Sequence, residues 1–251
     1  MILTFARRAS CAATLAFASV LLAMPAQADW RDRDQVLSNW EVVALTGRSM
    51  TQWGNAWWKF AFDNPEFLGD PTLSSLGDVP GPVFFAQGSG GEPFRARVDV
   101  PRGEYMLLPI ATYIWTFFDP CAEIRCAREI INKNFINGID DVFLKIDGRP
   151  VGNLAAHLVW VERHNPQVFL VDAGPIGEDG YGGILPALQG GYWVMLEPLA
   201  PGQHSVAFGA TVPDLDPFTG EPTGGTVELF ANLTVRVADC RQPRRCNKLR
   251  L

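Results

Sequence analysis

The chain has 251 residues, of which 47% are hydrophobic, and its 21 basic and 27 acidic side chains give a net charge of −6. An acidic chain without a basic run repels nucleic acid and anionic lipid, so the composition argues against a nucleic-acid-binding protein. The 24 glycines and 19 prolines indicate many turns, and the length suits one well-cored domain.

The first 28 residues have the pattern of a secretory signal peptide. Arg7 and Arg8 precede the apolar run "ASCAATLAFASVLLAM", and a small-x-small cleavage site ends at Ala28. We therefore expect a secreted or periplasmic protein that begins at Asp29. Removal of two arginines and no acidic residue changes the net charge from −6 to −8. No later segment has the about 20 apolar residues of a transmembrane helix, so we expect no integral membrane segment after signal removal.

Short apolar or alternating runs bounded by Gly, Pro, Asn and Asp predict strands along most of the remaining chain. They cover residues 82–88, 95–101, 105–118, 141–148, 158–163, 167–174, 191–199, 204–212 and 226–237. Proline-glycine turns at 101–103 and 201–202 are each expected to join two strands. The pattern predicts a mainly β protein, with one antiparallel, jelly-roll-like β-sandwich domain over residues 29–239.

Two α-helices are predicted to pack on these strands. The first lies in "SMTQWGNAWWKFAFDNP", where Ser49 or Thr51 can cap its start and Pro65 follows its end. One face of this helix carries Trp53, Trp57, Phe60 and Ala61. Such a broad apolar face predicts core packing. Trp58 lies off this face and is either core as well or an exposed ring that stacks on a ligand such as a sugar.

The second helix is predicted to follow Cys121, because apolar residues recur there at helical spacing: Ile124, Ala127, Ile130 and Ile131. Four cysteines remain after signal removal: Cys121, Cys126, Cys240 and Cys246. An even number of cysteines in an exported chain indicates disulfides, with three possible pairings. A zinc site is the alternative, although structural zinc usually has closer cysteine spacing. We expect disulfides to hold the basic tail, residues 240–251.

Several motifs occur in an order that resembles a family of uncharacterised exported bacterial proteins. They are "QWGNAWWKFAF", "DPT", "GPVFFAQG", "VDVPRGEYMLLPI", the "CAEIRCAREIINKNFINGIDDVFLKIDG" segment and "GYWVMLEPLAPGQHSVAFGA". Members of the family carry a W-x3-W-W helix, a V-D-G strand and a closing L-x-P-L-x-P-G-x-H strand pair. The family often has one cysteine after D-P-T-G and another before V-P-x-G, where this chain has "LSSLGD" and Val98, so the resemblance implies that one family disulfide is absent here. The resemblance implies export and fold, and it implies no particular activity.

Residues suited to catalysis are few in this sequence. The only cluster that merits a test as a catalytic site consists of His157, Arg163, His164 and Tyr181. Ordinary strand or loop positions are the alternative for the histidines. The chain shows no nucleophile motif and no phosphate-binding glycine loop, and we expect neither a metal nor a cofactor. An enzyme is therefore the less favoured class.

Aromatic residues supply the candidates for ligand binding. Besides Trp58, they are Tyr181 and Tyr192, which belong to the glycine-rich segment 178–193 that we expect to form a loop at the rim of a site. The sequence favours a non-catalytic binding module for a glycan or a cell-envelope component. The alternatives are an extracellular hydrolase or lyase on a jelly-roll-like scaffold, and a structural or adhesive envelope protein.

Overall fold

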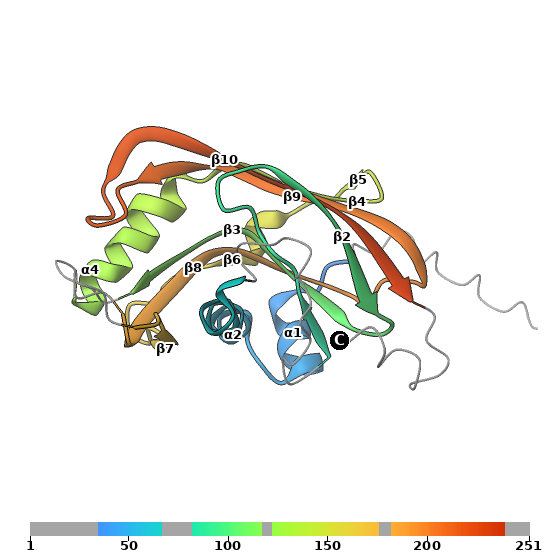
Figure 1. Cartoon of the computed structure of the whole chain (residues 1–251), viewed down its shortest axis with the longest axis horizontal. Coiled ribbons are helices and arrows are strands. Elements are labelled where there is room, and N and C mark those ends of the chain that lie inside the picture. Colours follow the sequence, from blue (N-terminus) through green and yellow to red (C-terminus); the bar gives the residue numbers. More distant parts are fainter. Residues whose placement is uncertain (1–34, 67–81, 117–121, 176–181, 239–251) are drawn as a thin grey trace, which may run out of the picture. The chain divides into compact units, whose positions relative to one another are not determined.

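Strands dominate the described part of the chain in this computed structural model, which covers residues 35–66, 82–116, 122–175 and 182–238 (Figure 1). All of these residues belong to one unit, Asp34–Leu251. The mainly β class predicted from the sequence is confirmed. The predicted signal peptide 1–28, the tail 240–251, Tyr181 and three of the four mature cysteines lie outside the described residues.

The strands form two five-stranded sheets. The first sheet has the order β1-β3-β8-β6, with β7 also paired to β8. Its strands are β1 Val83–Phe85, β3 Tyr105–Thr116, β6 Leu158–Val159, β7 Phe169–Asp172 and β8 Ile184–Leu196. The second sheet has the order β2-β10-β9-β4-β5. Its strands are β2 Phe94–Pro101, β4 Asp140–Ile146, β5 Arg149–Pro150, β9 Gly202–Leu215 and β10 Pro222–Ala238.

Both sheets are mixed, whereas the sequence predicted antiparallel pairing throughout. Strand β1 runs parallel to β3, and β2 runs parallel to β10. The predicted turns connect strands of different sheets: residues 101–105 lead from β2 to β3, and residues 196–202 lead from β8 to β9. Parallel neighbours are far apart along the chain, so a pattern of local runs and turns does not reveal them.

Three α-helices occur in the described residues, where the sequence predicted two. They are α1 Asn39–Thr46, α2 Met50–Asp63 and α4 Ile124–Glu129. The last continues into a π-helix, Ile130–Phe135, and a 3-10 turn, Ile136–Gly138; a second 3-10 turn spans Leu154–His157. Cys126, half-buried in α4, is disulfide-bonded, and the pairing of the cysteines outside the described residues stays a prediction.

The core consists of three clusters of buried apolar side chains. The first contains residues of both sheets, among them Leu108 and Val194 from one and Phe208 and Leu233 from the other. The second packs α1 and α2 against the other face of β3 and β8, and Figure 1 shows both helices on the side away from β9 and β10. The third lies around α4 and its π-helical continuation. Within the described residues, no helix combines the length and apolarity needed to cross a bilayer.

Candidate functional site

The candidate site is built on helix α2, whose start follows directly from the sequence. Ser49 and Gln52 form a reciprocal cap: the Gln52 N–H donates to Ser49 Oγ at 3.2 Å, and the Ser49 N–H donates to Gln52 Oε1 at 2.8 Å. This satisfies two main-chain donors that a helix start otherwise leaves open. The helix is thereby fixed at the residue where its aromatic face begins.

Helix α2 lies close against β8 because a glycine occupies their contact. A Cβ atom at Gly54 would be 2.6 Å from Nε2 of Gln189 and 3.0 Å from the ring of Trp193. The first distance is shorter than real Cβ contacts, so a larger residue at position 54 would displace the amide of Gln189. Because of this close contact, the side of α2 next to its buried face also lies beside the sheet.

A chain of hydrogen bonds connects β8, α2 and the segment before β7. Gln189 is 3% exposed, and its Oε1 accepts from Nε1 of Trp193 at 2.7 Å. Its Nε2 donates to Oδ1 of Asn55 at 3.2 Å and to the carbonyl of Thr51 at 3.3 Å. Nδ2 of Asn55 then donates to the carbonyl of Gln167 at 3.4 Å. Two amide side chains therefore hold β7 beside α2.

Between α2 and β7 lies an open groove of about 550 Å³. Asn55, Ala56 and Lys59 form its helical wall, and residues 169–172 of β7 with Ile184 of β8 form the other. Its lining is largely apolar, and its polar residues are Asn55, Lys59 and Asp172. Apolar concavities with a few polar rim groups are the usual form of ligand sites.

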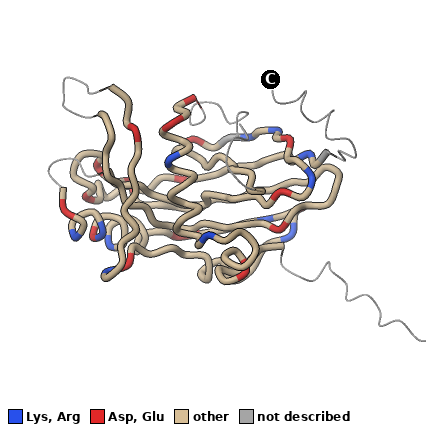
Figure 2. Tube along the Cα trace, turned by 90° about the horizontal axis from the view of Figure 1, so that it is seen from below, with Lys and Arg blue, Asp and Glu red and all other residues tan. Residues whose placement is uncertain are grey.

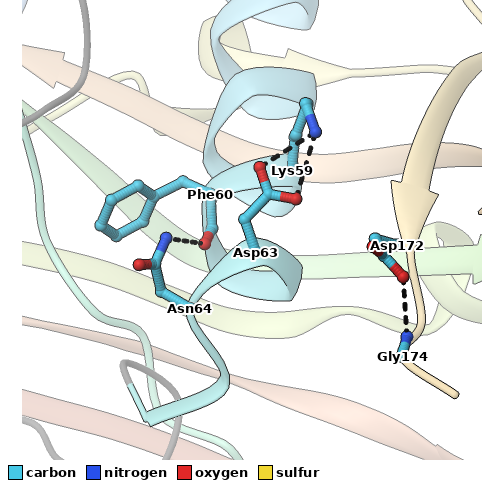
Figure 3. A network of polar contacts seen from close by, with 6 residues as sticks. All are labelled: Lys59, Phe60, Asp63, Asn64, Asp172 and Gly174. Atoms are coloured by element: carbon cyan, nitrogen blue, oxygen red, sulfur yellow. Dashed lines mark hydrogen bonds and ion pairs between the residues drawn. The ribbon is translucent and has the colours of Figure 1, made fainter.

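Three charged side chains lie beside the groove, and two of them, Lys59 and Asp63, pair with each other (Figure 3). The ammonium of Lys59 is 2.9 and 3.1 Å from the two carboxylate oxygens of Asp63, one turn further along α2. On β7, Asp172 accepts a hydrogen bond from the Gly174 N–H at 3.0 Å and has no cationic partner among the described residues. The uncompensated charge at this groove is therefore negative.

The tryptophans of α2 divide into core and partly exposed residues. Trp53 and Trp57 are 1% and 3% exposed, and the indole of Trp57 donates to the carbonyl of Ala86 at 2.7 Å. Trp58 is half-buried and meets Trp57 edge to face, with ring centroids 5.0 Å apart. Its Nε1 is buried and has no acceptor among the described residues. The core role predicted for the main stripe holds, and the ligand role of Trp58 stays a prediction.

The residues predicted for catalysis differ in exposure. His157 is 7% exposed, whereas Arg163 and His164 lie on the surface. The strand expected over 158–163 is only two residues long, β6, so simple alternation does not apply to this segment. None of these three residues lines the groove, and Tyr181 lies outside the described residues.

The segment 178–193, expected as a loop, is mostly strand, which corrects the prediction. β8 begins at Ile184 and continues past Tyr192. Tyr192 is half-buried, pairs with Ala111 and Leu158 on the neighbouring strands, and packs against the core. Tyr192 is thus held within the sheet and not on a loop.

Several residues of the site were not predicted. Gln189 was missed, although one polar side chain in the apolar run "ILPALQGGYWVML" is a signal of a buried hydrogen-bond network. The contact between α2 and the segment before β7 was also missed, because Asn55 and Gln167 are 112 positions apart in the sequence. Helix α1 carried a readable signal, the S-x-x-E capping box of Ser38 and Glu41.

A second polar cluster ties the β4–β5 turn to the start of β9. His204 places Nδ1 2.9 Å from Oδ2 of Asp147 and Nε2 2.8 Å from the carbonyl of Ala200, and the Ser205 N–H donates to Oδ1 of Asp147 at 2.9 Å. Burial alone lowers the pKa of His204, but the bonds to Asp147 and Ala200 and the carboxylate charge outweigh it, so this pKa is raised. Burial alone raises the pKa of Asp147, yet the bonds from His204 and Ser205 outweigh that and lower it.

Metal and charge give no further site in the described residues. No group of three His, Cys, Asp or Glu side chains there is placed to hold a metal ion. Figure 2 shows Lys and Arg positions interspersed with Asp and Glu positions along the described trace.

Comparison with known proteins adds little to this geometry. No family model matches the chain, and no curated protein matches it. Among solved structures, the solution structure of amebosin is 8% identical, with a TM-score of 0.21, over 61% of this chain and 96% of that chain. A TM-score this low establishes no common fold.

Proposed function

We propose that the chain is an exported, non-catalytic binding module of the cell envelope and that its ligand lies in the α2–β7 groove. The observation that carries the proposal is the groove itself, an apolar concavity with a few polar side chains on an anchored helix and strand. Its apolar lining suits an apolar or peptide segment of an envelope component better than a bare sugar. The exported location rests on the signal-peptide pattern of residues 1–28.

We also propose that the two sheets pack as a jelly-roll-like sandwich. Support comes from the largest core cluster, which draws side chains from both sheets. A scaffold of this kind holds a site on its edge rigidly, because the core keeps both sheets in register while loops and edge strands contact the ligand.

The experiment compares three forms of the processed protein for co-sedimentation with isolated cell envelopes. Ala56→Arg places a long charged side chain in the groove, and Ala44→Arg makes the same change at an exposed position of α1. Wild type and Ala44→Arg should co-sediment, and Ala56→Arg should stay in solution while its thermal unfolding stays cooperative, although Ala56 packs beside the core. Equal behaviour of all three would show that the groove is not the binding site. Release of soluble fragments from the envelopes would favour the hydrolase or lyase instead.

A second candidate, glycan binding, is favoured by an aromatic pair on the second sheet. Phe143 of β4 and Phe230 of β10 both stand opposite Gly209 of β9, with ring centroids 6.0 Å apart. Their neighbours Leu144 and Ala231 lie in the core between the sheets, so strand alternation places the rings on the opposite face. Both rings are partly exposed. Aromatic faces suit the C–H groups of sugars.

A glycan array separates the two candidates. Binding that is lost in Phe230→Ala and kept in Ala56→Arg would assign a glycan to the second sheet. Binding lost in Ala56→Arg alone would place a glycan in the groove, and no binding would leave the apolar or peptide ligand as the proposal.

A further inference from the structure

Strand β7 has a free edge, and its pairing with β8 determines which main-chain N–H and C=O groups point outward from that edge. β7 pairs only with β8 among the described strands. The Ala173 N–H donates to the carbonyl of Gly183 at 2.9 Å, so this pair is a hydrogen-bonded one. In an antiparallel ladder hydrogen-bonded pairs alternate with non-hydrogen-bonded ones, so Leu170 and Asp172 belong to the latter and direct their N–H and C=O groups away from β8.

The sequence of β8 supports this assignment independently. Leu170 stands opposite Pro186, which has no N–H to donate. Proline fits where no ladder bond is required of it, as in a non-hydrogen-bonded pair. Two observations therefore agree on the direction of the unused groups of β7, and no hydrogen bond of the Leu170 or Asp172 main chain to another described segment occurs.

The surface beside this edge is largely apolar. The groove lies between α2 and β7, and its lining includes Leu170 and Ile184. Leu170 and Ile184 are 57% and 63% exposed, among the most exposed large apolar side chains of the described residues. An added strand would cover part of this apolar surface with its own side chains. Proteins normally protect such edges with charges, proline or a covering segment, and β7 carries only Asp172.

The carboxylate charge of Asp172 indicates the kind of side chain that the partner strand carries. The ammonium of Lys59 is already paired with Asp63, while the carboxylate of Asp172 on the free edge has no cationic partner among the described residues (Figure 3). A lysine or arginine on an incoming strand would compensate it. Charge complementarity therefore favours a strand that carries one basic residue among apolar ones.

We infer that β7 accepts an extended peptide strand of a partner protein, apolar with a single lysine or arginine, which adds to the first sheet along the free edge. This inference rests on the proposed function of the groove and names its ligand class. Main-chain bonds to Leu170 and Asp172 supply the affinity, and the groove and Asp172 select the side chains.

The test uses a short synthetic peptide of alternating valine and threonine with one central lysine. Two analogues carry N-methyl groups on alternate residues, one analogue on each main-chain edge. Because a strand bound to β7 uses only one of its edges, one analogue should lose binding by about tenfold or more and the other should keep it. Equal affinity of both analogues and the parent would overturn the inference.

Substitutions in β7 test strand addition from the side of the protein. Leu170→Pro removes an N–H from the free edge and leaves the ladder to β8 intact, whereas Leu170→Thr keeps the N–H and loses the apolar side chain. Leu170→Pro should weaken the parent peptide by about tenfold, and Leu170→Thr should weaken it less. Asp172→Asn should weaken the lysine peptide and not its norleucine analogue. Unchanged affinity in Leu170→Pro contradicts strand addition.

The outcomes also separate this inference from the proposed function. If no peptide binds while Ala56→Arg still abolishes envelope binding, the groove binds something other than a strand. If Ala56→Arg has no effect either, both proposals fail. Self-association of the protein that Leu170→Pro abolishes would assign the edge to a second copy and overturn the partner peptide.

Discussion

Replacement of Gln189 by methionine tests the hydrogen-bond network that places β7 beside α2. Methionine keeps the length of the side chain and removes both its acceptor and its donor. Trp193 is fully buried, and its indole N–H would then have no acceptor. A buried donor left without a partner costs about 1 to 3 kcal/mol, and each of the two lost bonds from Nε2 adds about 0.5 kcal/mol. Burial of a more apolar side chain offsets about 1 kcal/mol, so the expected loss of unfolding free energy is about 2 kcal/mol.

Urea denaturation of Gln189→Met and of three further variants measures this value. Gln203→Met makes the same chemical change at an exposed position of β9 and should stay within about 0.5 kcal/mol of wild type. Trp193→Phe removes the donor, and the double variant with Gln189→Met closes a double-mutant cycle. The expected coupling energy is at least about 1 kcal/mol, because removal of both partners leaves no unpaired group. Wild-type stability of Gln189→Met, or a coupling near zero, would refute the network.

Three other predictions concern stability and processing. His204→Gln should lower the unfolding free energy most below pH 6.5, where the histidine is protonated in both states, and less as the pH rises through the raised pKa of the folded state, because the stability that the raised pKa contributes is lost there. A difference that does not change with pH contradicts the pairing with Asp147. Trp57→Ala should cost about 3 to 5 kcal/mol and the half-buried Trp58→Ala clearly less; equal melting temperatures of the two variants would make Trp58 core. Mass spectrometry of the exported protein should give Asp29 as the first residue, and an intact chain in the cytosol would contradict the signal peptide.

Local signals in the sequence were sufficient for α2 and for the strands β2 and β10. The cap at Ser49 and the spacing of Trp53 and Trp57 predicted a helix that the structure extends from Met50 to Asp63. Alternation predicted β2 and β10 within a few residues of their observed bounds. These elements form because propensity, capping and apolar period agree with one another.

The prediction of a loop over 178–193 was wrong because glycine at position 190 is required by close packing and not by a turn. A Cβ atom at Gly190 would lie 2.8 Å from Ile131 and 3.0 Å from the carbonyl of Val159, so this residue allows helix and strand to approach β8. A run of glycines read in isolation indicates a loop, and only the three-dimensional neighbours show that it belongs to a strand. The groove was unpredictable for the same reason, since its walls come from segments more than a hundred residues apart.

The tryptophans that define the helix motif lie in the core, whereas residues between them line the groove. In W-x3-W-W the first two tryptophans, Trp53 and Trp57, are core residues, while Asn55 and Ala56 stand at open positions of the motif and line the groove.

The strand motifs show the same division. The aspartate of "KIDG" and the histidine of "PGQH" meet as Asp147 and His204, a pairing that ties β4 to β9 outside the groove. In this chain the motif residues Trp53, Trp57, Asp147 and His204 thus belong to the scaffold, and none of them lines the groove. If the groove binds a ligand, exchange of Ala56 between two proteins that share these motifs should change ligand preference, whereas Asn55 should be kept because its hydrogen bonds hold β7 beside α2.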